Sequence, residues 1–162
     1  MPNLVITHPL APLDNVALYR QIGTAFGRTR EAENLCSRFE LAYREVRKKK
    51  FPQRKVLYLI WKDPWMTVSR DTYVSRTLQL FGMVTVPEQA EKRYPELNNL
   101  DLPGADLVLL STEPYRFREK HRKELQASLR KPVHLIDGEM TSWYGPRAIA
   151  GLGYLSDFAA AL

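Results

Sequence analysis

Residues 56–61 read VLYLIW, a continuous apolar run that follows a basic segment and precedes Lys62-Asp63-Pro64. A strand with one face in water alternates apolar and polar side chains, whereas a strand buried on both faces is apolar throughout. Such strands occur mainly in parallel sheets that helices cover on both sides. The run therefore predicts a central strand of an α/β layer.

The chain after this run alternates between helical and extended patterns. Apolar residues at helical spacing predict helices over 71–81 and 117–129, and a last helix that opens at Pro146. Short apolar runs predict strands over 83–86, 107–110 and 133–136, with 87–104 mostly loop. Right-handed crossovers between parallel strands place helices on both faces. We therefore predict a three-layer α/β lobe over residues 55–162 with a mainly parallel sheet of about four strands.

Residues 1–54 do not fit this alternation and predict a helical arm with one short N-terminal strand, Leu4–Thr7. A first helix over 14–26 has an apolar stripe made of Val16, Tyr19, Ile22 and Phe26. A second helix begins at Thr29 and ends near Lys50, which makes a rod roughly 30 Å long. We expect the arm (1–54) and the lobe (55–162) to be separate units.

Composition indicates a folded protein. The chain has 162 residues, of which 44% are apolar and 26% charged. It contains no run of 18 apolar residues, so the sequence predicts no membrane span. The opening MPNLVITHPL shows no export signal, which predicts a cytoplasmic location if the chain is the complete gene product. With one cysteine, Cys36, the chain forms no internal disulfide.

The net charge of +6 lies in the first third of the chain. Residues 1–55 hold 11 basic and 5 acidic side chains, so the remainder of the chain is formally neutral. A nucleic-acid-binding domain carries its basic residues on the surface that meets the phosphates. We therefore expect no nucleic-acid partner for the lobe.

Aromatic residues gather directly after the predicted strands. All three tryptophans lie in such segments, at Trp61, Trp65 and Trp143. In open α/β sheets, ligands bind outside the carboxyl ends of the strands. Flat aromatic faces with a few polar groups suit a large conjugated ligand. The alternative is structural, with Trp61 as core and Trp143 closing the sheet edge.

The sequence offers little for catalysis. It lacks the dinucleotide fingerprint, the phosphate-binding loop and the nucleophile elbow, and His8, His121 and His134 show no metal-ligand spacing. Glu113 and Glu139 both follow strands, so they are candidates for an acid/base pair or for holding amine or amide groups of a ligand. Because no nucleophile accompanies them, we expect a protein that is not an enzyme.

Four segments resemble one family in the right order: WKDPWMTVSRDTYVSRTLQLFG from residue 61, KRYPEL from 92, DLVLLSTEPYRFREKH from 106 and HLIDGEMTSWYGPR from 134. They are similar to the C-terminal lobe of cobalamin-type periplasmic solute-binding proteins, whose two lobes are joined by a long helix. The resemblance covers about residues 56–155. VITHPL from residue 5 and the helices after it resemble the end of the N-terminal lobe and the backbone helix.

The resemblance implies a non-enzymatic receptor that delivers its ligand to the permease of an ABC importer in the periplasm. The implied ligand is cobalamin, haem or another iron chelate, with no intrinsic cofactor and no metal held by the protein itself. The implied ligand-binding residues are Trp65, Met66, Tyr94, Glu139 and Trp143.

Two departures from the family pattern bear on function. Most of the N-terminal lobe has no counterpart, which implies a truncated or divergent receptor. Leu100 stands where the family carries a transporter-docking glutamate, for which Glu96 or Asp101 are the substitutes. The alternatives are a non-transport protein–protein interaction module and an α/β enzyme that uses Glu113 or Glu139. Because the N-terminal strand and the stripe lack a cover in this sequence, we also expect a two-fold homodimer.

Overall fold

The computed structural model describes residues 4–88, 91–100 and 104–162. Its helices are α1 (Asp14–Ala25), α2 (Thr29–Lys48), α3 (Tyr73–Gln79), α4 (Glu119–Leu129), α5 (Gly138–Ser142) and α6 (Arg147–Ala161). Its strands are β1 (Arg54–Trp61), β2 (Met66–Thr67), β3 (Met83–Thr85), β4 (Leu107–Ser111) and β5 (Val133–Ile136). No helix of the described part of the chain combines the length and the apolarity that crossing a membrane requires.

The sheet is built around β1. Strands β3, β1, β4 and β5 are mutually parallel, which confirms the predicted α/β class and its four parallel strands. The fifth strand, β2, pairs antiparallel with the carboxyl-terminal end of β1. Strand β4 occupies one edge of β1. The other edge is shared: β3 pairs with the amino-terminal end of β1 and β2 with its carboxyl-terminal end. Every part of the sheet therefore connects through β1.

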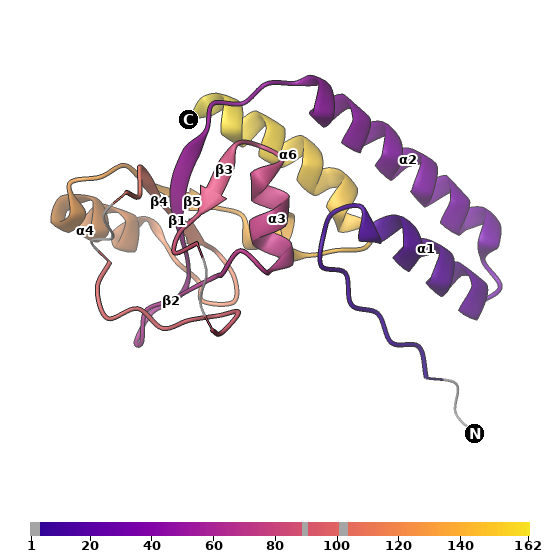
Figure 1. Ribbon diagram of the computed structural model, residues 1–162, viewed down its shortest axis with the longest axis horizontal. Helices are drawn as coiled ribbons and strands as arrows, with labels where there is room; N and C mark the ends of the chain where they lie inside the picture. Colours follow the sequence, from indigo (N-terminus) through magenta and orange to yellow (C-terminus); the bar gives the residue numbers. More distant parts are fainter. Residues whose placement is uncertain (1–3, 89–90, 101–103) are drawn as a thin grey trace.

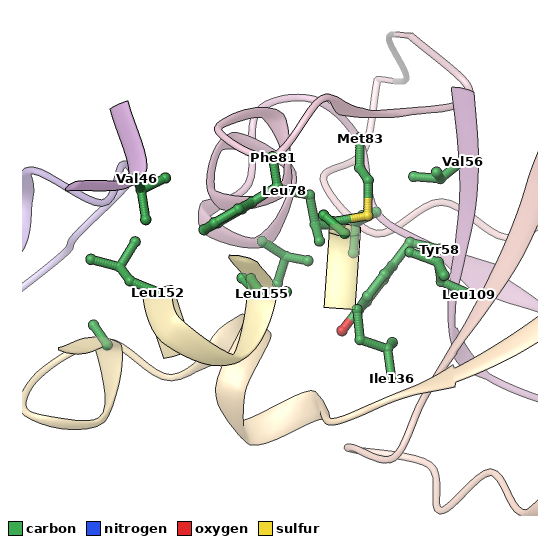
Figure 2. Packing of buried hydrophobic residues seen from close by; sticks show 14 of the residues in the cluster. Val46, Val56, Tyr58, Leu78, Phe81, Met83, Leu109, Ile136, Leu152 and Leu155 are labelled. Carbon is green, nitrogen blue, oxygen red and sulfur yellow. The ribbon is translucent and has the colours of Figure 1, made fainter. Parts of the chain in front are cut away.

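Side chains of β1 alternate between two apolar layers, as the VLYLIW run predicts. Val56 and Tyr58 belong to the core cluster beneath α3 and α6, which Figure 2 shows from close by. Leu57 and Leu59 belong to the cluster on the opposite face, where α4 lies. Both layers are dry, because these four side chains are almost completely buried. Burial of this extent supplies the main driving force for the fold.

The arm packs directly on the lobe. Helix α2 lies alongside α6, and its buried Phe39 and Val46 belong to the same core cluster as Leu152 and Leu155 (Figure 1). The Asn15 amide donates hydrogen bonds to the Pro12 carbonyl and the Tyr73 hydroxyl, at 2.8 and 2.9 Å.

The segment before α6 is joined to α1 as well. The Gly145 N–H donates to the Asn15 side chain at 2.7 Å, and the Tyr19 hydroxyl donates to the Gly145 carbonyl at 2.8 Å. Burial raises the pKa of Tyr19, so its hydroxyl keeps the proton that it donates. The helical arm thus fixes a loop of the lobe.

The predicted strand at Leu4–Thr7 is wrong, because residues 4–10 have no regular secondary structure. A strand needs a neighbouring strand to satisfy its backbone, and here the segment runs beside α1 (Figure 1). The Gln21 amide donates to the Ile6 carbonyl at 3.1 Å.

The predicted stripe of α1 is correct only in part. Tyr19 is buried and Val16 is half-buried, but Ile22 is 42% exposed and Phe26 74% exposed. The helix buries instead a face made of Asn15, Leu18, Tyr19 and Gly23. A Cβ atom at Gly23 would lie 2.4 Å from the Cβ of Ala32 on α2. This close approach sets the rotation of α1 and leaves Ile22 and Phe26 outward.

His121 supports the segment that leads from β4 into α4. It is buried, and its Nδ1 accepts the Arg118 N–H at 3.0 Å, which caps the helix. The rings of Tyr115 and Phe117 lie 5.7 and 5.6 Å from its own. Burial lowers the pKa of His121, and the nearby positive charges of Lys120 and Lys62 lower it further. The folded protein therefore keeps this imidazole neutral.

We predict that the protein loses stability when the pH falls from about 7.5 to about 5.5, through the ordinary histidine pKa of about 6.5. The unfolded chain takes up the proton first, because the folded-state pKa of His121 is lowered, and protonation removes the acceptor for Arg118. His121→Asn should reduce this loss in urea unfolding, although His134, whose pKa burial also lowers, contributes too. The control is the exposed His8→Asn. An undiminished loss in His121→Asn would contradict the assignment.

Candidate ligand-binding site

The segments that follow β1, β4 and β5 meet at the carboxyl edge of the sheet. Backbone hydrogen bonds join them, from the Tyr115 N–H to the Ile60 carbonyl and from the Thr112 N–H to the Ile136 carbonyl. The Gly138 N–H donates to the Thr112 hydroxyl at 2.9 Å. A Cβ at Gly138 would lie 2.7 Å from the Glu113 nitrogen, so only glycine allows this approach. The edge is thus a rigid surface made from three connections.

An apolar hollow of about 380 Å³ opens at this edge. Its lining is mostly aromatic and aliphatic: Tyr58, Ile60, Trp61, Met66, Val68, Val74, Tyr94, Glu113, Pro114 and Ser142. The Tyr58 hydroxyl is hydrogen-bonded to Ser111 and Thr141, at 2.9 and 2.6 Å. Burial raises the pKa of Tyr58 to about 12. This phenol is therefore a neutral, satisfied part of the wall.

Trp143 lies beside this hollow, and contacts with two neighbouring side chains fix its ring. Its side chain is half exposed, and its indole Nε1 donates to Glu113 Oε2 at 2.9 Å. The Arg147 guanidinium lies 5.2 Å from the centre of the Trp143 ring and pairs with Glu139. A cation over an indole face is attracted to it, so both contacts fix the ring. Together with Ser142 and Tyr144, Trp143 lines a further hollow of about 400 Å³.

Glu113 and Glu139 lie on one larger polar hollow of about 910 Å³, as their positions after strands predict. Each carboxylate already has its own partner, Trp143 for Glu113 and Arg147 for Glu139. They therefore help to hold the Trp143 ring and the Arg147 guanidinium in place.

The predicted site residues lie in different parts of this edge. Met66 and Tyr94 line the apolar hollow, Trp143 the hollow next to it, and Glu139 the polar one. Trp65 stacks on Phe117, with ring centres 6.1 Å apart, and Phe117 borders the polar hollow. These positions make Trp65 a support for the wall, while the other four line the hollows.

Other lining residues were not predicted as site residues. Trp61, Pro114, Ser142 and Tyr144 all line the hollows. The signal that identifies them is their place at the ends of β1 and α5 or within three residues after β4 and α5. Within residues 4–88, 91–100 and 104–162, no group of histidine, cysteine and carboxylate side chains is arranged to hold a metal ion.

The expected docking position is not available at Leu100. This side chain is buried in the core cluster beneath α4, so it cannot meet a partner. Glu96 is exposed and follows Tyr94-Pro95 on the segment that bridges to Met66. Asp101, the other substitute, lies outside the described residues.

Comparison with known proteins supports the fold. No family model and no curated protein sequence matches the chain. A possible iron-binding periplasmic solute-binding protein from Staphylococcus epidermidis matches with a TM-score of 0.79 and 15% identity, over 95% of this chain and 64% of its own. The periplasmic vitamin B12 binding protein BtuF of Vibrio cholerae gives 0.77 and 12%, over 95% and 63%.

The periplasmic haem-binding protein RhuT from Roseiflexus gives a TM-score of 0.71 and 20% identity, over 93% of this chain and 63% of its own. This chain therefore spans less than two thirds of the length of these solved proteins. The resemblance read from the sequence is confirmed at the level of fold: the chain has the α/β architecture of the C-terminal lobe of periplasmic solute-binding proteins of the cobalamin, haem and iron type.

Proposed function

We propose that this chain is the ligand-binding lobe of a solute-binding protein for a metal chelate of the corrinoid, haem or iron-siderophore type. The observation that carries the proposal is the aromatic surface at the carboxyl edge of β1, where the hollows lined by Trp61, Tyr94 and Trp143 adjoin. Solved proteins with this fold include binders of vitamin B12 and of haem. Ligands of open α/β sheets bind at this edge.

The chemistry of the edge suits a flat, conjugated ring. Trp143 presents a half-exposed indole whose orientation Glu113 and Arg147 hold, so little ordering entropy is lost on binding. The neighbouring hollow removes apolar ligand surface from water. The Glu113 and Glu139 carboxylates hold Trp143 and Arg147, so both act in shaping the surface. Non-enzymatic binding is the activity that these contacts support.

A receptor of this kind works outside the cytoplasm and passes its ligand to an ABC importer. We extend the proposal to that location and that partner, for which the fold gives the support. Glu96 is the acidic side chain in the right segment to meet a permease, because it is exposed where Leu100 is buried.

Absorbance-detected titration with cobalamin, haem and a ferric siderophore tests the proposal. We expect one of the three to bind, weakly, because one face of the ligand remains in water. Trp143→Ala should then weaken binding by roughly 1–3 kcal/mol, the contribution of a buried aromatic contact. Leu41→Ala, which removes an exposed side chain of α2, is the matched control and should bind like the unmodified protein.

Absence of binding by all three chelates would overturn the proposal. Equal affinity of the unmodified protein and Trp143→Ala would show that the ligand binds elsewhere. Circular dichroism of both variants confirms that each is folded before it is titrated.

A second candidate function, a protein–protein interaction module, is favoured by the outer face of α1. Six large apolar side chains are exposed there and on the segment before it: Leu4, Val5, Ile6, Leu13, Ile22 and Phe26. Gln21 holds the Ile6 carbonyl, which keeps this segment against the helix. An exposed apolar patch of this kind marks an interface, and a two-fold copy buries the same residues twice. We propose that two copies associate through this face.

Light scattering at micromolar concentration should therefore report a mass of two chains. Phe26→Asp should restore the mass of one chain, because it places a charge in the buried centre of the interface. Leu41→Asp, on the exposed side of α2, should leave the dimer intact. A monomer in the unmodified protein would contradict the association, since the arm already packs on the lobe with Ile22 and Phe26 outward.

A further inference from the structure

Positive charge is concentrated in one short stretch that the proposed function does not use. Residues 44–55 hold seven basic side chains and one acidic side chain. Their excess equals the net charge of the whole chain, +6, so the remaining residues together are formally neutral. The cations of this stretch are named the basic edge: Arg44, Arg47, Lys48, Lys49, Lys50, Arg54 and Lys55.

The basic edge lies at the opposite end of the sheet from the hollows. Helix α2 ends at Lys48 and β1 begins at Arg54, so these cations surround the amino-terminal end of the central strand. Figure 1 shows this connection at the top of the molecule and β2, which pairs with the carboxyl-terminal end of β1, below it. The eight residues of β1 span roughly 26 Å. That distance separates the concentrated charge from the aromatic surface.

Glu45 is the acidic side chain within the stretch, and cations surround it. Lys48 pairs with it at 2.6 Å. This hydrogen bond lowers the pKa of Glu45, and the nearby charges of Arg44 and Lys49 lower it further. One carboxylate therefore faces three cations at the end of α2.

Acidic groups of other elements do not balance the remaining charge. Asp106 accepts the backbone N–H of Lys55 at 2.6 Å, and the exposed Asp157 follows Ser156, whose hydroxyl accepts from Lys49. The carboxyl-terminal end of α6 comes to the same side of the molecule (Figure 1). With Glu45 included, four negative groups at most face the seven cations.

Helix stabilisation accounts for only part of this charge. Cations in the last turn of a helix are stabilised by its dipole, which explains Arg47 and Lys48. The effect fades within one turn, so Arg54 and Lys55, which lie in β1, gain nothing from it. Like charges at neighbouring positions repel each other. An anionic partner relieves that repulsion.

The surface suits an extended layer of anions. All of these cations except the half-buried Arg54 are exposed. Phe51, the aromatic ring of the stretch, is half-buried and packs edge-on against Phe81 with ring centres 5.4 Å apart. The stretch therefore offers no ring on which a nucleic-acid base stacks. At the location proposed above, outside the cytoplasm beside an importer, phospholipid headgroups form such an anionic layer.

We infer that the basic edge binds the surface of a membrane that contains anionic phospholipids. Clusters of lysine and arginine are attracted to such a surface without inserting into it. Because the hollows lie at the other end of the sheet, the attached lobe keeps its aromatic surface turned away from the bilayer and open to solutes. The inference uses the proposed location but not the proposed ligand, so chelate titration and vesicle binding fail independently.

Sedimentation with lipid vesicles tests the inference. We expect the protein to sediment with vesicles that contain phosphatidylglycerol and not with vesicles of phosphatidylcholine alone. Binding should disappear at about 0.5 M salt, where the Debye length is below about 5 Å. Arg47→Gln/Lys50→Gln/Lys55→Gln should weaken binding at least about tenfold, because each cation near the surface contributes separately.

The matched control removes three exposed cations from outside the basic edge. Arg30→Gln/Lys92→Gln/Lys123→Gln has the same net charge as the first triple variant and should bind vesicles like the unmodified protein. Equal loss of binding in both variants would show an effect of net charge alone and overturn the inference. Binding that persists in the first variant, or that is equal on both kinds of vesicle, would overturn it too. Displacement from the vesicles by double-stranded DNA at equal phosphate concentration would assign the surface to nucleic acid instead.

Tryptophan fluorescence tests the orientation on the membrane. Trp61, Trp65 and Trp143 all lie in the connections at the carboxyl edge. Quenching by acrylamide, which is uncharged, should therefore be the same for the free and the vesicle-bound protein. Protection of the tryptophans in the bound protein would show that the carboxyl edge faces the bilayer, and would contradict attachment through the basic edge.

Discussion

Strand β1 is the constraint on which the rest of the structure depends. It pairs with β4 on one edge and with β2 and β3 on the other, and its side chains enter the core on both faces. A slip by one residue would exchange the side chains of its two faces, so neither core cluster would keep its packing. Its carboxyl end then places Ile60 and Trp61 at the mouth of the apolar hollow, and its buried Tyr58 forms part of the wall. The site is therefore a consequence of how the central strand ends.

The helical arm also helps to position the site. Asn15 and Tyr19 of α1 bond both backbone groups of Gly145, which lies two residues after Trp143. Gly145 has a positive φ of 80°, a conformation that glycine adopts without strain. The segment that carries Trp143 is thus fixed by Glu113 and Arg147 on one side and by α1 on the other. Packing of the arm on the lobe therefore also helps to fix the orientation of Trp143.

Sequence reasoning worked where a local pattern has one physical cause. The apolar run 56–61 is typical of a strand that is buried on both faces, and with the alternation of helices and strands after it the run indicated the α/β class. The face of α1 was mispredicted because buried Asn15 is polar and satisfied by distant partners, which an apolar stripe cannot reveal. Strand β2 and helix α5 were missed because two and five residues are too few to show a period.

The site, too, was predictable only where a local pattern was enough. Position after a strand was enough to place the tryptophans and both glutamates at one edge. Which side chain each carboxylate contacts depends on pairs that come from different structural elements. Glu113 and Trp143 are 30 residues apart in the chain, and Glu139 and Arg147 are eight apart. Periodicity carries no information about such pairs. The exposed Leu4 and Ile6 show the same limit, since a strand forms only when a partner strand is present.

The indole N–H signals of the three tryptophans in an isotope-labelled sample provide the most direct measurement of the central claim, that the carboxyl edge binds a conjugated ring. Each indole gives one signal, and a diamagnetic metalloporphyrin such as the zinc complex avoids paramagnetic broadening. The account predicts large shifts for Trp61 and Trp143, which line the hollows, and a smaller one for Trp65, which packs on Phe117. Unchanged Trp61 and Trp143 signals at a porphyrin concentration that saturates absorbance, or a change confined to Trp65, would contradict it.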